Sequence, residues 1–147
     1  KAVCFKEAME TEFIDYQKQI LANAKKLSSA LMDNDIDIVS NGTANHMFLV
    51  NLVKNNLTGK VLDAALGEAH ITVNKNSVPN DPQSPFVTSG IRIGTPAVTR
   101  RGFKENEMNM IAKWITDIIH DVDNIKLIEN TKNEVRDLCL QFPVYSR

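Results

Sequence analysis

Residues 74–103 of this 147-residue chain read NKNSVPNDPQSPFVTSGIRIGTPAVTRRGF. The stretch begins as the end of a strand, passes through a loop with three prolines and enters Ile91-Arg92-Ile93. Alternation predicts a strand there, with the two isoleucines on one face and Arg92 on the other. A guanidinium offers a planar fork to a carboxylate, so this arginine suits an anionic ligand. Taken by itself, an ion pair between Arg92 and a surface carboxylate is the more common arrangement.

Helical and strand patterns alternate on both sides of this stretch, which predicts an α/β fold. Apolar residues recur every three or four positions from Phe5 to Leu31, as in one long helix. Residues 46–53 are almost continuously apolar, which predicts a strand buried on both faces. Thr58 is a good N-cap for a helix over residues 59–68. We also expect strands at 36–39, 71–74 and 90–95, a helix starting near Glu105 and a last helix at 125–141.

Composition and charge narrow the function classes. A formal net charge of -1 and 43% apolar residues argue against a disordered chain and against a nucleic-acid-binding surface. No apolar run approaches the roughly 20 residues that a membrane helix needs. Cys4 and Cys139 are far apart and are typical of free thiols, so we expect a cytoplasmic location. The three histidines lack the spacing of a metal site, and we expect no metal.

Several stretches of the chain resemble the C-terminal domain of serine hydroxymethyltransferase, a fold-type I pyridoxal-phosphate enzyme. The matching strings are KAVCFKEAM, NGTANHMFLV, LTGK and ITVNKN, and the densest match is SVPNDPQSPFVTSGIRIGTPAVTRRGFKE. About thirty matching residues with proline, glycine and asparagine at fixed places are far more specific than a short motif. Two departures stand out: the family usually has aspartate where this chain has Ala44, and the resemblance fades after Asp123.

The resemblance implies a single α+β-like domain over residues 1–147, with a small, mainly antiparallel sheet covered by helices. A long helix at about 5–33 would precede the sheet and folate-type loop at about 36–95, and C-terminal helices would occupy about 104–142. The longer parent protein would transfer a one-carbon unit from serine to tetrahydrofolate, giving glycine and 5,10-methylenetetrahydrofolate. Its pyridoxal 5'-phosphate would be bound mainly by a large domain that this chain lacks. The chain alone would be inactive, and the parent would be a homodimer or larger.

The resemblance also implies roles for particular residues. Arg92 would bind the α-carboxylate of serine or glycine, and Asn76, Ser84, Pro85 and Phe86 would bind tetrahydrofolate. By sequence alone, Asn76 fits a turn, and Ser84-Pro85-Phe86 fits a rigid loop tip with one buried aromatic ring. No catalytic residue is expected in this chain, because the family's cofactor lysine follows Thr-His and no such triplet occurs here.

Other classes of protein remain open at this point. A related fold-type I enzyme, such as a threonine aldolase, would keep an arginine like Arg92 without a reason to keep the folate-type loop. A stand-alone ligand-binding α/β module and a pure interaction domain are the remaining alternatives, and the second would bind no small molecule.

Overall fold

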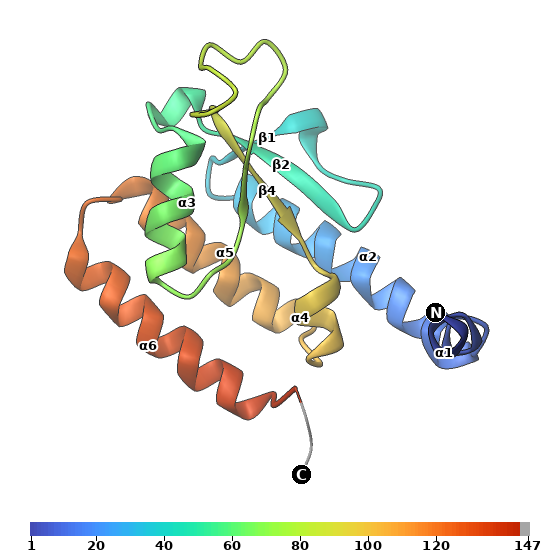
Figure 1. Cartoon of the computed structure of the whole chain (residues 1–147). Coiled ribbons are helices and arrows are strands. Elements are labelled where there is room, and N and C mark those ends of the chain that lie inside the picture. The colour runs from blue at the N-terminus through green and yellow to red at the C-terminus, as the bar shows by residue number, and fades with distance from the viewer. Residues whose placement is uncertain (145–147) are drawn as a thin grey trace.

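An antiparallel sheet of four strands forms one layer of the molecule, and helices form the other (Figure 1). The structure is a computed structural model and describes residues 1–144. The strands are β1 (Asp37–Ile38), β2 (Met47–Asn51), β3 (Asn74–Asn76) and β4 (Gly90–Gly94), in the order β1-β2-β4-β3. The α/β class and the small antiparallel sheet predicted from the sequence are confirmed.

Six helices accompany the sheet within residues 1–144. They are α1 (Ala2–Glu7), α2 (Thr11–Met32), α3 (Gly59–Glu68), α4 (Pro96–Arg100), α5 (Glu105–His120) and α6 (Ile125–Gln141), and two short 3-10 turns lie at Val39–Asn41 and Val53–Asn55. The predicted bounds of α3 and α6 are confirmed, and both helices begin at a side-chain cap. Thr58 accepts a hydrogen bond from the Val61 amide, and Asn124 accepts one from the Leu127 amide. Helix α4 was not predicted.

One face of the sheet packs against the helices and forms the core. Ile38, Phe48, Val50, Ile91 and Ile93 point into this layer and are each at most 6% exposed. They meet buried side chains of α2, α3 and α5, among them Leu27, Leu31, Leu62, Leu66, Met108, Ile115 and Ile118. Burying such a side chain contributes about 1.5–3 kcal/mol, so this face holds the strands in place.

The predicted long helix at about 5–33 is wrong in its first part. The chain leaves the helical conformation after Glu7, and Glu10 is extended where it caps the start of α2. Phe5 and Met9, expected on the inward stripe, are 67% and 84% exposed. Helix α1 and the start of α2 project from the body of the molecule (Figure 1). No other element within residues 1–144 therefore covers the apolar side chains of this part of the repeat.

The strand predicted at residues 46–53 is not buried on both faces. Phe48 and Val50 are buried, whereas Met47 is exposed and Leu49 is half-buried. His46 is exposed as well. Within residues 1–144, the helices that pack on the sheet lie on the side of Phe48 and Val50, and the other side of β2 is left uncovered. Strand β3 also starts at Asn74 rather than at residue 71.

Candidate ligand-binding face of the sheet

Arg92 lies in the middle of β4, on the face of the sheet turned away from the core. Ile91 and Ile93 are buried on the opposite face, as the alternation predicted, and Arg92 is exposed. Its partners across the strands are Leu49 on β2 and Asn74 on β3. The guanidinium is therefore presented from an interior strand, whose backbone is fixed by neighbours on both sides.

Asn76 shares this open face with Arg92. It pairs with Gly90, two residues before Arg92, so the two side chains are diagonal neighbours across β3 and β4. Such neighbours are separated by roughly 7–8 Å, a distance that one small molecule can bridge. The Asn76 amide donates a 2.8 Å hydrogen bond to the Ser77 carbonyl, which orients it where the strand becomes the loop.

A hollow of about 300 Å³ lies beside Arg92, between β2 and the turn that precedes it. The turn takes its shape from left-handed backbone at Ser40 and Asn41, and Gly42 follows with a φ of 129°. The Thr43 hydroxyl donates a 2.6 Å hydrogen bond to the Met47 carbonyl and closes the turn. The lining residues are Val39, Ser40, Gly42, Thr43, Ala44, Asn45, Met47, Phe48, Leu49 and Arg92. The position at which the chain departs from the family pattern, Ala44, thus faces the same space as Arg92.

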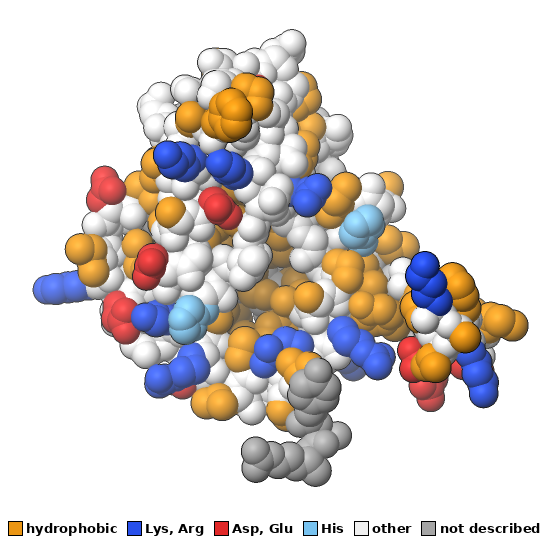
Figure 2. All heavy atoms as spheres, in the orientation of Figure 1, with side chains coloured by type: hydrophobic (Ala, Val, Ile, Leu, Met, Phe, Trp, Pro, Cys, Tyr) orange, Lys and Arg blue, Asp and Glu red, His pale blue; other side chains and the backbone are white. Residues whose placement is uncertain are grey.

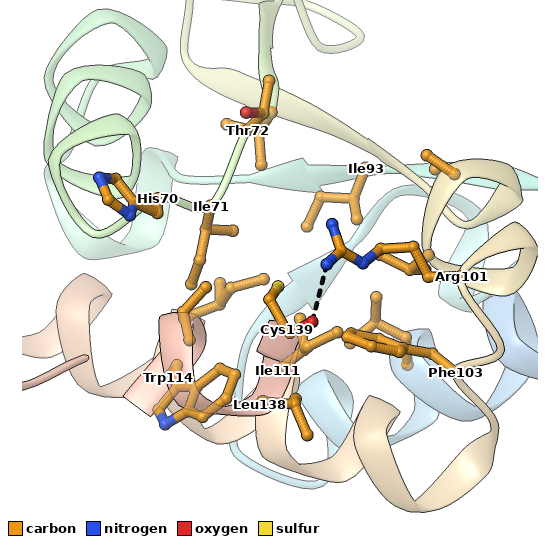
Figure 3. A pocket seen from close by; sticks show the side chains of 17 residues that line it. His70, Ile71, Thr72, Ile93, Arg101, Phe103, Ile111, Trp114, Leu138 and Cys139 are labelled. Carbon is orange, nitrogen blue, oxygen red and sulfur yellow. Dashed lines mark hydrogen bonds between the residues drawn. The ribbon is translucent and has the colours of Figure 1, made fainter. Parts of the chain in front are cut away.

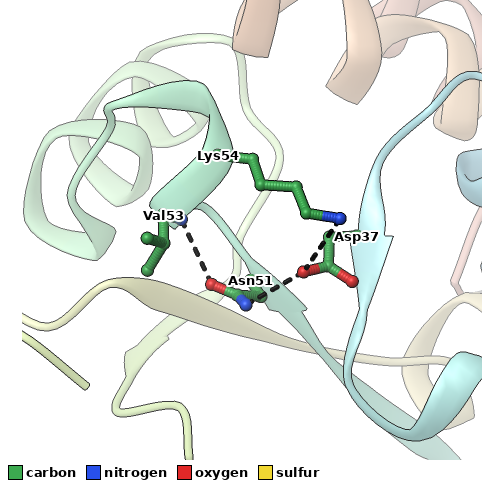
Figure 4. Close-up of polar contacts among 4 residues, drawn as sticks. All are labelled: Asp37, Asn51, Val53 and Lys54. Atoms are coloured by element: carbon green, nitrogen blue, oxygen red, sulfur yellow. Dashed lines mark hydrogen bonds and ion pairs between the residues drawn. The ribbon is translucent and has the colours of Figure 1, made fainter. Parts of the chain in front are cut away.

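The carboxylate of Asp37, at the β1 edge of the sheet, is satisfied by other groups (Figure 4). Asn51 donates a 2.9 Å hydrogen bond to it, and Lys54 lies 4.0 Å away. The Asn51 side-chain oxygen in turn accepts from the Val53 amide at 3.1 Å. Among residues 1–144, no carboxylate lies within ion-pair distance of Arg92. The surface ion pair considered for Arg92 is absent from the described part of the chain.

The loop between β3 and β4 is organised by Asp81, which the sequence analysis did not single out. Its carboxylate accepts hydrogen bonds from the amides of Val78 (3.1 Å), Gln83 (2.8 Å) and Ser89 (2.9 Å). Desolvation raises the pKa of Asp81, but the hydrogen bonds from Ser89, Gln83 and Val78 outweigh it and lower that pKa to about 2. The string Asn80-Asp81-Pro82 carried the signal, since aspartate before proline favours a turn held by its own side chain.

The tip of this loop, Ser84–Phe86, is held on both sides by backbone contacts. The Ser84 carbonyl accepts from the amides of Val87 and Thr88, and Lys75 donates a 2.8 Å hydrogen bond to the Phe86 carbonyl. Phe86 is 83% exposed, so the buried ring considered from the sequence is wrong. The loop rises beyond the β3–β4 end of the sheet (Figure 1), next to the end where Asn76 pairs with Gly90. The structure therefore brings Asn76 together with Arg92. The Ser84–Phe86 tip lies beyond the same end of the sheet and is held by Lys75, which pairs with Ile91 and so belongs to the opposite face.

A second cavity, of about 290 Å³, lies between α4, α5, α6 and the segment before β3 (Figure 3). Its lining is mainly apolar and contains none of the predicted site residues. Arg101 lies at its edge and donates hydrogen bonds to the carbonyls of Cys139 (2.9 Å) and Phe142 (3.2 Å), at the C-terminal end of α6. Arg101 therefore ties the end of α4 to the end of α6.

Some kinds of site are absent from residues 1–144. No cluster of histidine, cysteine and carboxylate side chains there could hold a metal ion. None of the helices there has the length and apolar character needed to cross a membrane. Cys4 and Cys139 are both free thiols.

An α/β domain that presents an arginine on an uncovered sheet face, beside a rigid polar loop, is typical of domains that bind small anionic ligands. Comparison with known proteins assigns the family. A sequence model described as serine hydroxymethyltransferase matches residues 1–115. The chain belongs to the serine hydroxymethyltransferase family, as its resemblance indicated.

Individual relatives extend the match to the whole chain. It is 57% identical to the serine hydroxymethyltransferase of Dichelobacter nodosus over 147 residues, which are 100% of this chain and 35% of that protein. It is 59% identical to that of Nitrosococcus oceani over 145 residues, 99% of this chain and 35% of the relative. The chain thus spans about a third of the length of the curated relatives it matches. The similarity includes the tail after Asp123, where the sequence resemblance fades.

Proposed function

We propose that this chain forms the C-terminal domain of a serine hydroxymethyltransferase that transfers a one-carbon unit from serine to tetrahydrofolate. The products would be glycine and 5,10-methylenetetrahydrofolate. The observation that carries the proposal is the position of Arg92, exposed on an interior strand between two buried isoleucines and facing an open hollow. Family membership and the high identity to named serine hydroxymethyltransferases support it.

Arg92 has the chemistry to bind the α-carboxylate of serine or glycine. Two parallel N–H groups of a guanidinium match the two oxygens of a carboxylate. Such a bidentate contact fixes the substrate at two points and so determines which bond at the α-carbon is held in the reactive orientation. Lysine would supply the same charge without this directional control.

The cofactor pyridoxal 5'-phosphate would be bound mainly by the rest of the parent protein. When bound, it supplies an electron sink for bond cleavage at the α-carbon. No lysine of this chain follows Thr-His, the setting that the resemblance gives for the cofactor lysine. Lys75, beside Asn76, donates its ammonium group to the Phe86 carbonyl. The domain would therefore contribute substrate orientation and no covalent chemistry, and the isolated chain would be inactive.

Tetrahydrofolate would bind along Asn76 and the Ser84–Phe86 tip. The Asn76 amide, held at the end of β3, can hydrogen-bond the edge of a pterin ring, and the exposed ring of Phe86 can form a wall beside it. Prolines at 79, 82 and 85 stiffen the loop, so less conformational entropy is lost when a ligand binds.

The projecting N-terminal helices would contact the rest of the parent or a partner subunit. Val3, Phe5, Met9 and Ile14 are each at least half exposed, on α1, the turn that follows it and the first part of α2. Figure 2 shows hydrophobic side chains at the surface of this lobe. Contiguous exposed apolar side chains of this kind are typical of an interface. A homodimer or larger assembly in the cytoplasm is consistent with this surface and with the free thiols.

The test is Arg92→Lys in the full-length enzyme. We expect the variant to fold and to retain its cofactor, while kcat/KM for serine falls roughly thirty- to a thousandfold, about 2–4 kcal/mol. Steady-state kinetics and a thermal melt measure both properties. Arg136→Lys, at an exposed position on α6, is the matched control and should leave both unchanged. Activity within about threefold of wild type with a normal melt would show that Arg92 does not bind the carboxylate.

A further inference from the structure

The two ends of the β3–β4 loop meet at one side chain. A single oxygen of Asp81, Oδ2, accepts hydrogen bonds from the amide of Val78 at the start of the loop and from that of Ser89 at its end. The other oxygen, Oδ1, accepts from the Gln83 amide, immediately before the Ser84–Phe86 tip. One carboxylate therefore joins the two ends of the loop and also fixes the residue at which its tip begins.

The residues at the two ends of the loop, which Asp81 joins, are closely packed against the rest of the domain. Val78 is 6% exposed, and a Cβ on Gly90 would lie only 2.5 Å from its side chain. Thr88, beside Ser89, has a left-handed φ of 61°, and its carbonyl accepts from the Gly59 amide at 2.9 Å. A non-glycine residue adopts that conformation only where its surroundings hold it. The Ser89 end of the loop is thus fixed against α3, and Asp81 connects it to the Val78 end.

We propose that Asp81 is a positioning residue, which holds the Ser84–Phe86 tip in its ligand-receiving shape before tetrahydrofolate binds. Asp81 points its carboxylate into its own loop and would not touch the ligand. The inference rests on the proposed function of the tip. Loss of Asp81 should affect one ligand and spare the other. A loop that must become ordered during binding lowers the affinity for the ligand at the tip, whereas the Arg92 contact on β4 stays intact.

The test is Asp81→Asn in the full-length enzyme. Asparagine keeps the size of the side chain, but its NH2 group replaces one acceptor and faces a backbone N–H that it cannot bond. We expect the KM for tetrahydrofolate to rise about five- to twentyfold, while the KM for serine stays within about twofold, from loss of the charged hydrogen bonds. Asp81→Glu keeps the charge and should recover part of the folate affinity. Asp63→Asn, on α3 and outside the loop, is the matched control and should behave as wild type.

Amide hydrogen exchange at Val78, Gln83 and Ser89 gives a readout independent of activity. We expect these three amides to lose protection in Asp81→Asn while amides of β4 keep theirs. An unchanged KM for tetrahydrofolate in Asp81→Asn, with a raised KM in Phe86→Ala, would overturn the positioning role and leave the proposed function standing. If neither variant changed it, the folate role of the tip would fail and this inference with it. Equal rises in the KM for serine and for folate, together with a lower melting temperature, would reduce Asp81 to a fold-supporting residue and overturn the inference.

Discussion

The two faces of strand β4 share one backbone but differ in burial and in chemistry. Ile91 and Ile93 are 0% and 6% exposed and are surrounded by side chains of the helices, whereas Arg92, between them, is exposed beside a hollow. The buried face gains its free energy from apolar contact and needs no particular chemistry. The open face contributes little to folding, so its residues are free to meet a ligand. One strand can thus supply both the rigidity and the binding group, because its side chains alternate.

The largest expected effect concerns the buried face. Ile91→Ala should lower the free energy of unfolding by about 2–5 kcal/mol, because it removes a fully buried side chain and leaves a cavity between the sheet and the helices. Chemical denaturation measures the change. Arg92→Ala, one residue away on the open face, is the control and should change stability by less than about 0.5 kcal/mol. Equal destabilisation by both substitutions would remove the distinction between the faces.

A smaller effect is expected at the margin of the open face. Asn76→Ala in the full-length enzyme should weaken tetrahydrofolate binding by about 0.5–1.5 kcal/mol, the contribution of one neutral hydrogen bond, and leave serine binding nearly unchanged. Separate titrations of serine and folate measure this, and Phe86→Ala should show the same selectivity. Were both ligands weakened equally, these residues would only support the fold.

The smallest expected effect is that of pH on the wild-type loop, through Asp81. Its pKa is lowered from 3.8 to about 2 in the folded protein, so its carboxylate stabilises the loop fully above the unfolded pKa. That stabilisation is lost as the pH falls from about 4 through about 2, and no change is expected between pH 5 and 8. A titration of the Asp81 carboxyl carbon by NMR should give a midpoint near 2. A midpoint near the unperturbed value of about 3.9 would mean that the carboxylate does not hold the loop in solution.

The sequence predicted those parts of the fold that depend on local pattern. The Thr58 cap located the start of α3, and the Ile91-Arg92-Ile93 alternation correctly separated the two faces of β4. The wrong burial predictions, at Phe5, Met9 and β2, depend on which elements cover which. The apolar repeat through Phe5 and Met9 predicted buried side chains, because no pattern in the sequence shows that the helix ends at Glu7.

The same limit applied to the candidate site. The alternation in β4 placed Arg92 on the open face, but the diagonal position of Asn76 required the register of β3 against β4. Asp81 was overlooked because its importance comes from joining Val78 to Ser89, a contact between the two ends of a loop that spacing does not reveal. The apolar run at residues 46–53 likewise suggested a strand buried on both faces, since only the assembled sheet shows that one face is uncovered.

The central claim is that Arg92 contacts the substrate carboxylate, and a substrate and variant cycle tests it most directly. Wild type and Arg92→Gln, as full-length enzymes, would each be titrated with L-serine and with L-serinamide, which lacks the carboxylate charge. If the contact exists, wild type prefers serine strongly, and the preference collapses in the variant, with a coupling of about 2 kcal/mol or more. A coupling below about 0.5 kcal/mol, meaning that the substitution weakens both compounds equally, would contradict the claim.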